Sequence, residues 1–136
     1  MGKLQFKKLV VDSKPGRNAV ISVLELKDYI DFEVKRVYFI HENTGDTSQH
    51  AHHKEKELFV MQKGACTAVI DQGNGIEEVL LTAPRDAVYI GSYVWHGFKD
   101  FEPGSVLLAL SSTNYSPDRS DYLENYEEYK DFVAKM

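Results

Sequence analysis

The chain has 136 residues, of which 43% are hydrophobic and 27% charged, and its formal net charge is −5 at pH 7. This length fits one domain, which we expect to span residues 1–136. The negative charge argues against a nucleic-acid-binding protein, because phosphate backbones are bound by clustered Lys and Arg. No apolar run approaches the ~20 residues that cross a bilayer, and residues 1–9 lack the apolar core of a secretory signal. Since the single cysteine, Cys66, cannot form an internal disulfide, we expect a cytoplasmic location.

Short segments rich in β-branched and aromatic residues predict a fold built mainly of strands. In chain order these segments cover residues 19–26, 32–40, 58–61, 65–71, 76–81, 88–90, 95–101 and 106–111. The stretch Gln72-Gly73-Asn74-Gly75 separates two of them and predicts a hairpin, because Gly and Asn accept the positive φ angles of tight turns. About eight strands with turn signals between them are typical of an antiparallel sandwich or barrel.

The pattern becomes helical from Asp121 onward. Aromatic and aliphatic residues recur there at helical spacing, at Tyr122, Leu123, Tyr126, Tyr129, Phe132 and Val133. Ser120 or Asp121 is the expected N-cap, and the acidic residues of the first turns suit the helix dipole. We expect a C-terminal helix that packs its aromatic face against the outside of the barrel.

The segment His50–Glu57, with the sequence HAHHKEKE, carries the strongest functional signal. Side chains repeat with period two along a strand, so His50 and His52 point to the same side. Gly64 follows, and later a second segment, Pro84–His96. This two-part pattern resembles the signature of the cupins, which implies an all-β fold, a cupin-type antiparallel β-barrel (jelly roll), followed by the C-terminal α-helix. In metal-binding cupins the matching positions are the ligands, here His50, His52, Glu57 and His96.

A narrower resemblance extends from about residue 30 to the C-terminus. It is carried by Lys35–Ile40, His50–His52, Val88–His96 and Ser120–Leu123, in that order. In this combination the chain resembles the nucleotide-sugar 3,4-ketoisomerases, which are WxcM-like cupins. The resemblance implies an isomerase that converts dTDP-4-keto-6-deoxyglucose to dTDP-3-keto-6-deoxyhexose in the biosynthesis of 3-amino-3,6-dideoxy sugars. It also implies no metal or other cofactor, and a homodimer with exchanged N-terminal strands.

Histidine suits the chemistry of such an isomerase. Moving a carbonyl from C4 to C3 requires removal of the C3 proton, an enediol intermediate and return of a proton to C4. The unperturbed pKa of histidine, about 6.5, allows proton exchange near neutral pH. We assign His50 as the base and His52 as its partner in proton return or in stabilising the enediolate, and the reverse order stays open.

The resemblance implies substrate contacts as well. Arg36 and Tyr38 are two residues apart, hence on one face of their strand, where they would contact the diphosphate and the sugar. Trp95, His96 and Glu57 are expected to complete the substrate site.

Three stretches depart from the family pattern. Thr47-Ser48-Gln49 stands where most members have an arginine and a glycine, so one phosphate contact is missing or comes from elsewhere. The N-terminal motif is altered, and either Lys14 or Arg17 could replace its charge. Glu57 stands where members commonly have glutamine.

Glu57 leaves alternatives open. Three histidines and a glutamate could bind iron, manganese, nickel or zinc, which would indicate a metal-dependent cupin enzyme. Against a metal stands the better whole-chain match to metal-free relatives, in which a carboxylate could orient an imidazole. A noncatalytic sugar-binding cupin is a third possibility, and it would bind its ligand without turnover. The sequence leaves the configuration of the product at C4 undecided.

Overall fold

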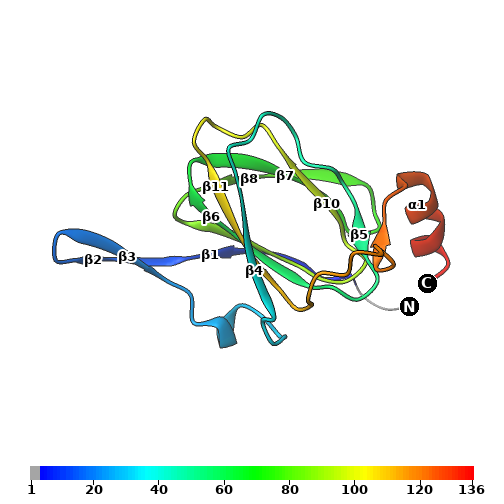
Figure 1. Cartoon of the computed structure of the whole chain (residues 1–136), viewed down its shortest axis with the longest axis horizontal. Coiled ribbons are helices and arrows are strands. Elements are labelled where there is room, and N and C mark those ends of the chain that lie inside the picture. Colours follow the sequence, from blue (N-terminus) through cyan, green and yellow to red (C-terminus); the bar gives the residue numbers. More distant parts are fainter. Residues whose placement is uncertain (1–3) are drawn as a thin grey trace.

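Two antiparallel sheets enclose the barrel in the computed structural model, which describes residues 4–136 (Figure 1). The five-stranded sheet runs in the order β1 (Phe6–Val10), β9 (Asp86–Ile90), β6 (Glu57–Lys63), β11 (Val106–Ser111) and β4 (Arg36–His41). The three-stranded sheet consists of β10 (Trp95–Lys99), β7 (Ala65–Asp71) and β8 (Ile76–Thr82). The antiparallel barrel confirms the predicted fold class.

The interior side chains of both sheets form the main core. Phe59 and Leu107 from the larger sheet pack with Ile70 and Phe98 from the smaller one, and each is at most 3% exposed. The alternation of buried and half-buried residues along β11 shows why strand periodicity predicted these segments. The hairpin between β7 and β8 is also confirmed, with Gly73 at a φ of 95°.

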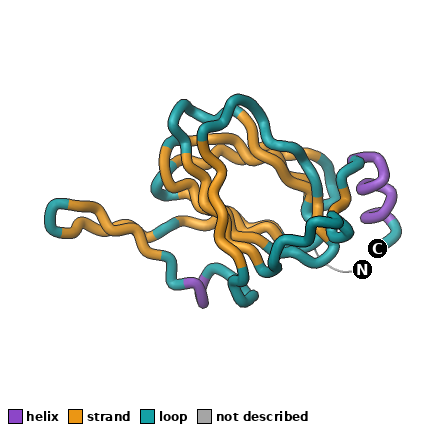
Figure 2. Tube along the Cα trace, viewed as in Figure 1, coloured by secondary structure: helices purple, strands orange, loops and turns teal. Residues whose placement is uncertain are grey.

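Smaller elements complete the fold. The strands β2 (Asp12–Gly16) and β3 (Ala19–Val23) form a hairpin that projects away from the barrel, and a 3-10 turn, η1 (Leu26–Asp28), follows (Figures 1 and 2). The predicted strand 19–26 is therefore shorter and does not belong to the barrel. The two-residue strand β5 (Ala51–His52) pairs with β12 (Tyr122–Leu123) near the C-terminus.

The C-terminal helix, α1 (Tyr126–Ala134), begins later than predicted. Its N-cap is Asn125, whose side chain accepts a hydrogen bond from the amide of Glu128 at 3.0 Å. The predicted N-cap at Ser120 or Asp121 is wrong, because the residues after Asp121 pair with β5 as a strand. The helix does pack an aromatic face on the outside of the barrel, where Tyr129 is fully buried against Trp95. Within residues 4–136, no helix combines the length and the apolar character needed to cross a membrane.

Candidate active site

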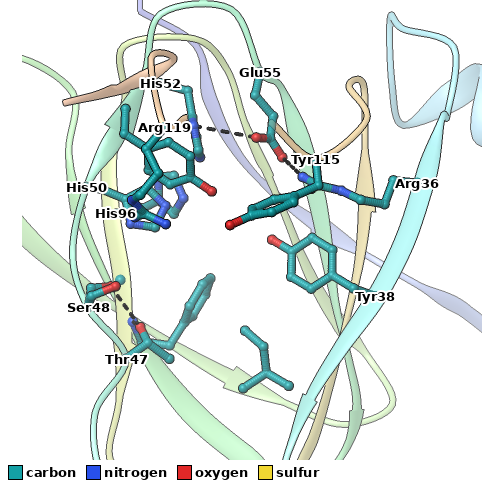
Figure 3. Close-up of a pocket in the computed structure, with 14 residues that line it drawn as sticks. Arg36, Tyr38, Thr47, Ser48, His50, His52, Glu55, His96, Tyr115 and Arg119 are labelled. Carbon is teal, nitrogen blue, oxygen red and sulfur yellow. Dashed lines mark hydrogen bonds and ion pairs between the residues drawn. The ribbon is translucent and has the colours of Figure 1, made fainter. Parts of the chain in front are cut away.

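Three histidines meet at one end of the barrel. The backbones of His50 and His96 bond to each other, with N–O distances of 3.0 and 2.9 Å, and strand alternation turns His52 to the same side as His50. Their ring centroids lie 4.8 Å apart for His50 and His52, 4.9 Å for His50 and His96, and 5.7 Å for His52 and His96. The structure thus brings the three imidazoles together (Figure 3).

The imidazoles line a cavity of about 420 Å³. Arg36 and Tyr38, on β4, face them from the other side (Figure 3). Tyr115 and Arg119 reach the cavity from the segment before β12, and the sequence analysis missed both because an irregular loop has no periodicity. The remaining lining residues are Ile40, Thr47, Ser48, Glu55, Gly97, Phe98 and Tyr122.

Glu57 lies beneath the imidazoles and is 1% exposed. Its Oε1 is 3.4 Å from Nε2 of His52 and 3.3 Å from Nε2 of His96, and its Oε2 accepts a hydrogen bond from the Tyr38 hydroxyl. Burial disfavours the carboxylate, but the two imidazoles outweigh burial and hold the pKa of Glu57 well below its usual range. The phenol of Tyr38 stays protonated, because burial and the charge of Glu57 raise its pKa.

His52 is surrounded by carboxylates. Its Nδ1 lies 3.5 Å from Oε1 of Glu55 and 3.5 Å from Oδ2 of Asp121, opposite the Nε2 that faces Glu57. Burial disfavours the imidazolium, but Glu57, followed by Glu55 and Asp121, outweighs burial and raises the pKa of His52. The position of His52 therefore favours the charged imidazolium.

His50 has the opposite environment. Among residues 4–136, no carboxylate oxygen lies within 4.0 Å of its ring nitrogens. Burial and the neighbouring His96 and His52 lower the pKa of His50 to about 3. The pKa values of two adjacent histidines of the cavity are thus shifted in opposite directions.

Arg36 is bound to Glu55 within the protein. Its Nη2 lies 2.7 Å from Oε2 of Glu55, and the hydroxyl of Ser111 donates to the same oxygen at 2.6 Å. Burial and the nearby Glu57 raise the pKa of Glu55. The sequence analysis did not single out Glu55, although it lies in the histidine segment three residues after His52.

Asp121 positions the segment that carries His52. Its carboxylate accepts hydrogen bonds from the backbone amides of Lys54, at 2.7 Å, and Glu55, at 3.1 Å. Next to it, Tyr122 pairs with His52 across the β5–β12 ladder, and its ring centroid lies 4.6 Å from that of His52. Asp121, which was one of the two predicted helix N-caps, instead holds the backbone next to His52 in place.

Trp95 is not brought to the cavity. Alternation along β10 turns its ring outward while His96 points inward, and Trp95 packs 5.2 Å from Tyr129, between ring centroids. Its Nε1 donates to Oε1 of Gln49 at 3.0 Å, so it holds the segment that precedes His50. Gly97 lets the segment that contains Gln49 lie close to β10, because a Cβ at position 97 would lie 2.4 Å from Cγ of Gln49.

The imidazoles could also hold a metal ion. One ligand atom from each of His50, His52 and His96 lies within 4.8 Å of the others, and a second such group consists of His52, Glu55 and Glu57. Nitrogen ligands of this kind suit zinc, iron or nickel. Glu57 falls in the second group, and one of its oxygens is bound by the Tyr38 hydroxyl.

Comparison with known proteins places this chain in a family. The model of the family described as "FdtA: WxcM-like, C-terminal" matches residues 3–134. A TDP-4-oxo-6-deoxy-alpha-D-glucose-3,4-oxoisomerase from Aneurinibacillus thermoaerophilus is 36% identical over 135 residues, which cover 98% of this chain and 92% of that protein.

Solved structures agree with this match. A 3,4-ketoisomerase from Helicobacter canadensis superposes with a TM-score of 0.85 at 29% identity, covering 96% of this chain and 98% of the other. A mutant of the 3,4-ketoisomerase QdtA from Thermoanaerobacterium thermosaccharolyticum, in complex with TDP-4-keto-6-deoxyglucose, gives a TM-score of 0.84 at 26% identity, covering 96% and 94%. The chain therefore belongs to the WxcM-like FdtA family.

Proposed function

We propose that the chain is an isomerase that converts dTDP-4-keto-6-deoxyglucose to dTDP-3-keto-6-deoxyhexose. The observation that carries the proposal is the pair of adjacent histidines on one wall of the cavity, whose surroundings favour the neutral form of His50 and the charged form of His52. Acid–base chemistry on neighbouring atoms requires such a difference in protonation state. The family and the name of the relative from Aneurinibacillus thermoaerophilus support the choice of reaction and substrate.

In the proposed reaction, the neutral imidazole of His50 removes the C3 proton and the electron pair of the C–H bond forms the C3–C4 double bond. The imidazolium of His52 gives a proton to the oxygen on C4, which yields the enediol. The double bond then takes the proton from His50 at C4 while the hydroxyl on C3 returns a proton to His52. Both histidines end in their starting states, and the carbonyl lies at C3.

The low pKa of His50 suits the second half of this reaction. A proton on His50 is disfavoured by burial and by His96 and His52, so the group returns it readily to carbon. The same low basicity slows the first step, and the charge on His52 offsets this by stabilising the enediolate as it forms. The 3-keto product suits transamination in the synthesis of 3-amino-3,6-dideoxy sugars.

The space around the histidines suits a nucleotide-linked sugar. A second cavity, of about 630 Å³, adjoins the first and shares with it Arg36, Glu55, Tyr115 and Tyr122. A sugar next to the histidines could therefore be continuous with a nucleoside in the second cavity. This arrangement supports a substrate larger than a free monosaccharide.

We also propose a homodimer in which the β2–β3 hairpins are exchanged. The hairpin projects from the barrel with Val20 69% and Ile21 50% exposed (Figure 2). The edge strand β4 leaves Val37 and Phe39 54% and 58% exposed. Exposed apolar side chains on a projecting hairpin and on a sheet edge are typical of an interface. Sedimentation should give a dimer, and Ile21→Asp should shift it toward monomer; a monomeric wild type would contradict this assembly.

The test of the reaction is incubation of the purified protein with dTDP-4-keto-6-deoxyglucose, followed by NMR of the product. A 3-keto product supports the proposal and also gives the configuration at C4. Binding of the substrate without turnover would instead support the noncatalytic alternative.

The cluster of three imidazoles favours one rival, a metal-dependent cupin enzyme. Metal analysis of protein purified without chelator separates the two. About one equivalent of metal per chain, together with loss of activity after chelation, would support the rival. Full activity after chelation would support proton transfer by the histidines alone.

A further inference from the structure

Two cationic side chains reach the cavity. Among residues 4–136, Arg36 and Arg119 are the Lys or Arg residues that line it. They lie on opposite sides, Arg36 next to Tyr38 and Arg119 next to the histidines (Figure 3). A diphosphate carries negative charge that guanidinium groups bind well, so both arginines are candidates for this contact.

The charge of Arg36 is already balanced inside the protein. The Arg36 side chain is 22% exposed, and its partner Glu55 is 4% exposed. Ser111 ties the pair together, because its hydroxyl donates to Glu55 and lies 3.3 Å from Nη2 of Arg36. A phosphate bound to Arg36 would lie close to a buried carboxylate, which repels it. Arg36 therefore brings little net positive charge to the cavity.

The ion pair that Arg119 forms is more exposed than that of Arg36. Its side chain is 42% exposed and pairs with Glu124, which is 52% exposed, at 2.6 Å. Exposed ion pairs of this kind contribute little free energy, so a phosphate can replace Glu124 as the partner. The guanidinium carbon lies 3.9 Å from the ring centroid of Tyr122, a cation–π contact that keeps the group at the cavity.

The backbone around Arg119 is held in an uncommon conformation. Arg119 has a φ of 56°, in the left-handed region that residues other than glycine rarely adopt. The turn is closed by hydrogen bonds from the amide of Arg119 to the carbonyl of Ser116, at 3.2 Å, and from the amide of Tyr122 to the carbonyl of Arg119, at 3.1 Å. The side chain of Asp118 accepts from the amide of Ser120 at 2.9 Å. Strained residues held by their surroundings cluster at functional sites.

The position of Arg119 matches the path of a nucleotide sugar. Tyr122, on which Arg119 lies, lines both cavities, as Arg36 does, whereas His50, His52 and His96 line the first alone. A diphosphate that joins a sugar at the histidines to a nucleoside in the second cavity would pass Tyr122. The charge of Arg119 also reaches the histidines, since it contributes, after burial and the other two imidazoles, to lowering the pKa of His50.

We propose that Arg119 is the residue that binds the diphosphate of the nucleotide sugar and makes the site selective for diphosphates. This inference rests on the proposed function, which supplies the class of ligand. The sequence Thr47-Ser48-Gln49 lacks a cation ahead of the histidines, and Arg119 supplies one from a different segment of the chain.

The test compares ligands with and without phosphates. Calorimetry gives the Kd of TDP, and ligand-observed NMR gives that of thymidine, for wild type, Arg119→Ala and Arg119→Lys. We expect the alanine variant to raise the Kd of TDP about tenfold or more and to leave that of thymidine unchanged. The lysine variant should lie between, because it keeps the charge without the planar fork.

Two control variants test whether a loss of TDP binding could come from a general change in charge or from the loss of the ion pair with Glu124. Lys130→Ala removes one positive charge from an exposed ion pair on α1 and should leave the Kd of TDP unchanged. Glu124→Gln frees Arg119 and should leave TDP binding equal or tighter. Melting curves check that each variant folds.

Three outcomes would overturn the inference: TDP binding by Arg119→Ala that equals wild type, an equal loss of TDP and thymidine, or a wild type that does not bind TDP. Failure of the proposed function looks different, because the wild type would then bind TDP through Arg119 without isomerising the keto sugar.

Discussion

Replacing Glu57 by glutamine should neutralise His52 and slow the reaction. Glu57 is fully buried, and its Oε1 lies within 3.4 Å of Nε2 of both His52 and His96. The glutamine amide has nearly the same shape and can still accept a hydrogen bond from Tyr38, so the barrel should fold. Because Glu57 is the main carboxylate that raises the pKa of His52, the variant should lower this pKa and favour the neutral imidazole.

The expected loss of stability is moderate. Breaking a buried ion pair costs about 3–5 kcal/mol when the partner stays charged. In this variant His52 can release its proton, so the cost reduces to two weakened contacts of about 1–1.5 kcal/mol each, or about 2–3 kcal/mol. Loss of the imidazolium removes one preorganised group from the enediolate, which should lower kcat about 10²–10³-fold.

The loss should depend on pH with a definite sign. The raised pKa of His52 stabilises the fold below about pH 6.5, and this contribution disappears as pH rises through the raised value. The lowered pKa of Glu57 stabilises the fold above about pH 4.3, and this contribution is lost as pH falls. The difference in stability between wild type and variant should therefore be largest near pH 6 and should shrink at alkaline pH.

Urea unfolding, product NMR and histidine ¹H–¹⁵N spectra measure these three effects. Glu78→Gln is a matched control, because it neutralises an exposed carboxylate paired with Lys99 and should leave all three unchanged. An imidazolium at His52 that persists in Glu57→Gln at pH 8, or a kcat equal to wild type, would refute the assignment of its charge to Glu57.

Three further predictions concern other parts of the site. His50→Asn should abolish exchange of solvent deuterium into dTDP-4-keto-6-deoxyglucose with an unchanged circular dichroism spectrum; retained exchange would exclude His50 as the base. Asp121→Ala should lower the free energy of unfolding by about 2–4 kcal/mol in urea titrations, because two backbone amides lose a charged acceptor; a cost under about 0.5 kcal/mol would contradict this role. Asn125→Ala should cost about 1 kcal/mol by the same measurement, as the loss of a helix N-cap does, and no change would show that the helix depends on packing alone.

Local periodicity predicted the parts of the fold that depend on local sequence. Alternation along residues 106–111 reappears in β11, and the same rule correctly placed His50 and His52 on one side. The alternation rule also predicts that Trp95 and His96, which are adjacent on one strand, face opposite sides. The family resemblance instead placed both residues at the substrate, and in the structure Trp95 packs against Tyr129. Strand alternation alone would have predicted that the side chain of Trp95 points away from the cavity.

Long-range pairing explains what the sequence could not reveal. Tyr122 and Leu123 have helical spacing with the residues after them, yet they pair with β5, about 70 residues earlier in the chain. This pairing brings Asp121 to the amides of Lys54 and Glu55, and Arg119 to the cavity. No local pattern marks these residues, because their role depends on where a distant strand lies.

The same arrangement explains how a metal-type motif can serve proton transfer. In a metal site, the carboxylate and the imidazoles direct their lone pairs at one ion. Here the Tyr38 hydroxyl occupies one oxygen of Glu57, and the other oxygen faces two imidazole nitrogens at ion-pair distance. A carboxylate placed in this way raises the pKa of His52, whereas burial and the neighbouring imidazoles outweigh its effect on His50, whose pKa falls to about 3. Tyr38→Phe should therefore free Glu57 and increase the affinity of the site for zinc in a calorimetric titration, and an unchanged zinc affinity would show that Tyr38 does not decide between the two uses of the motif.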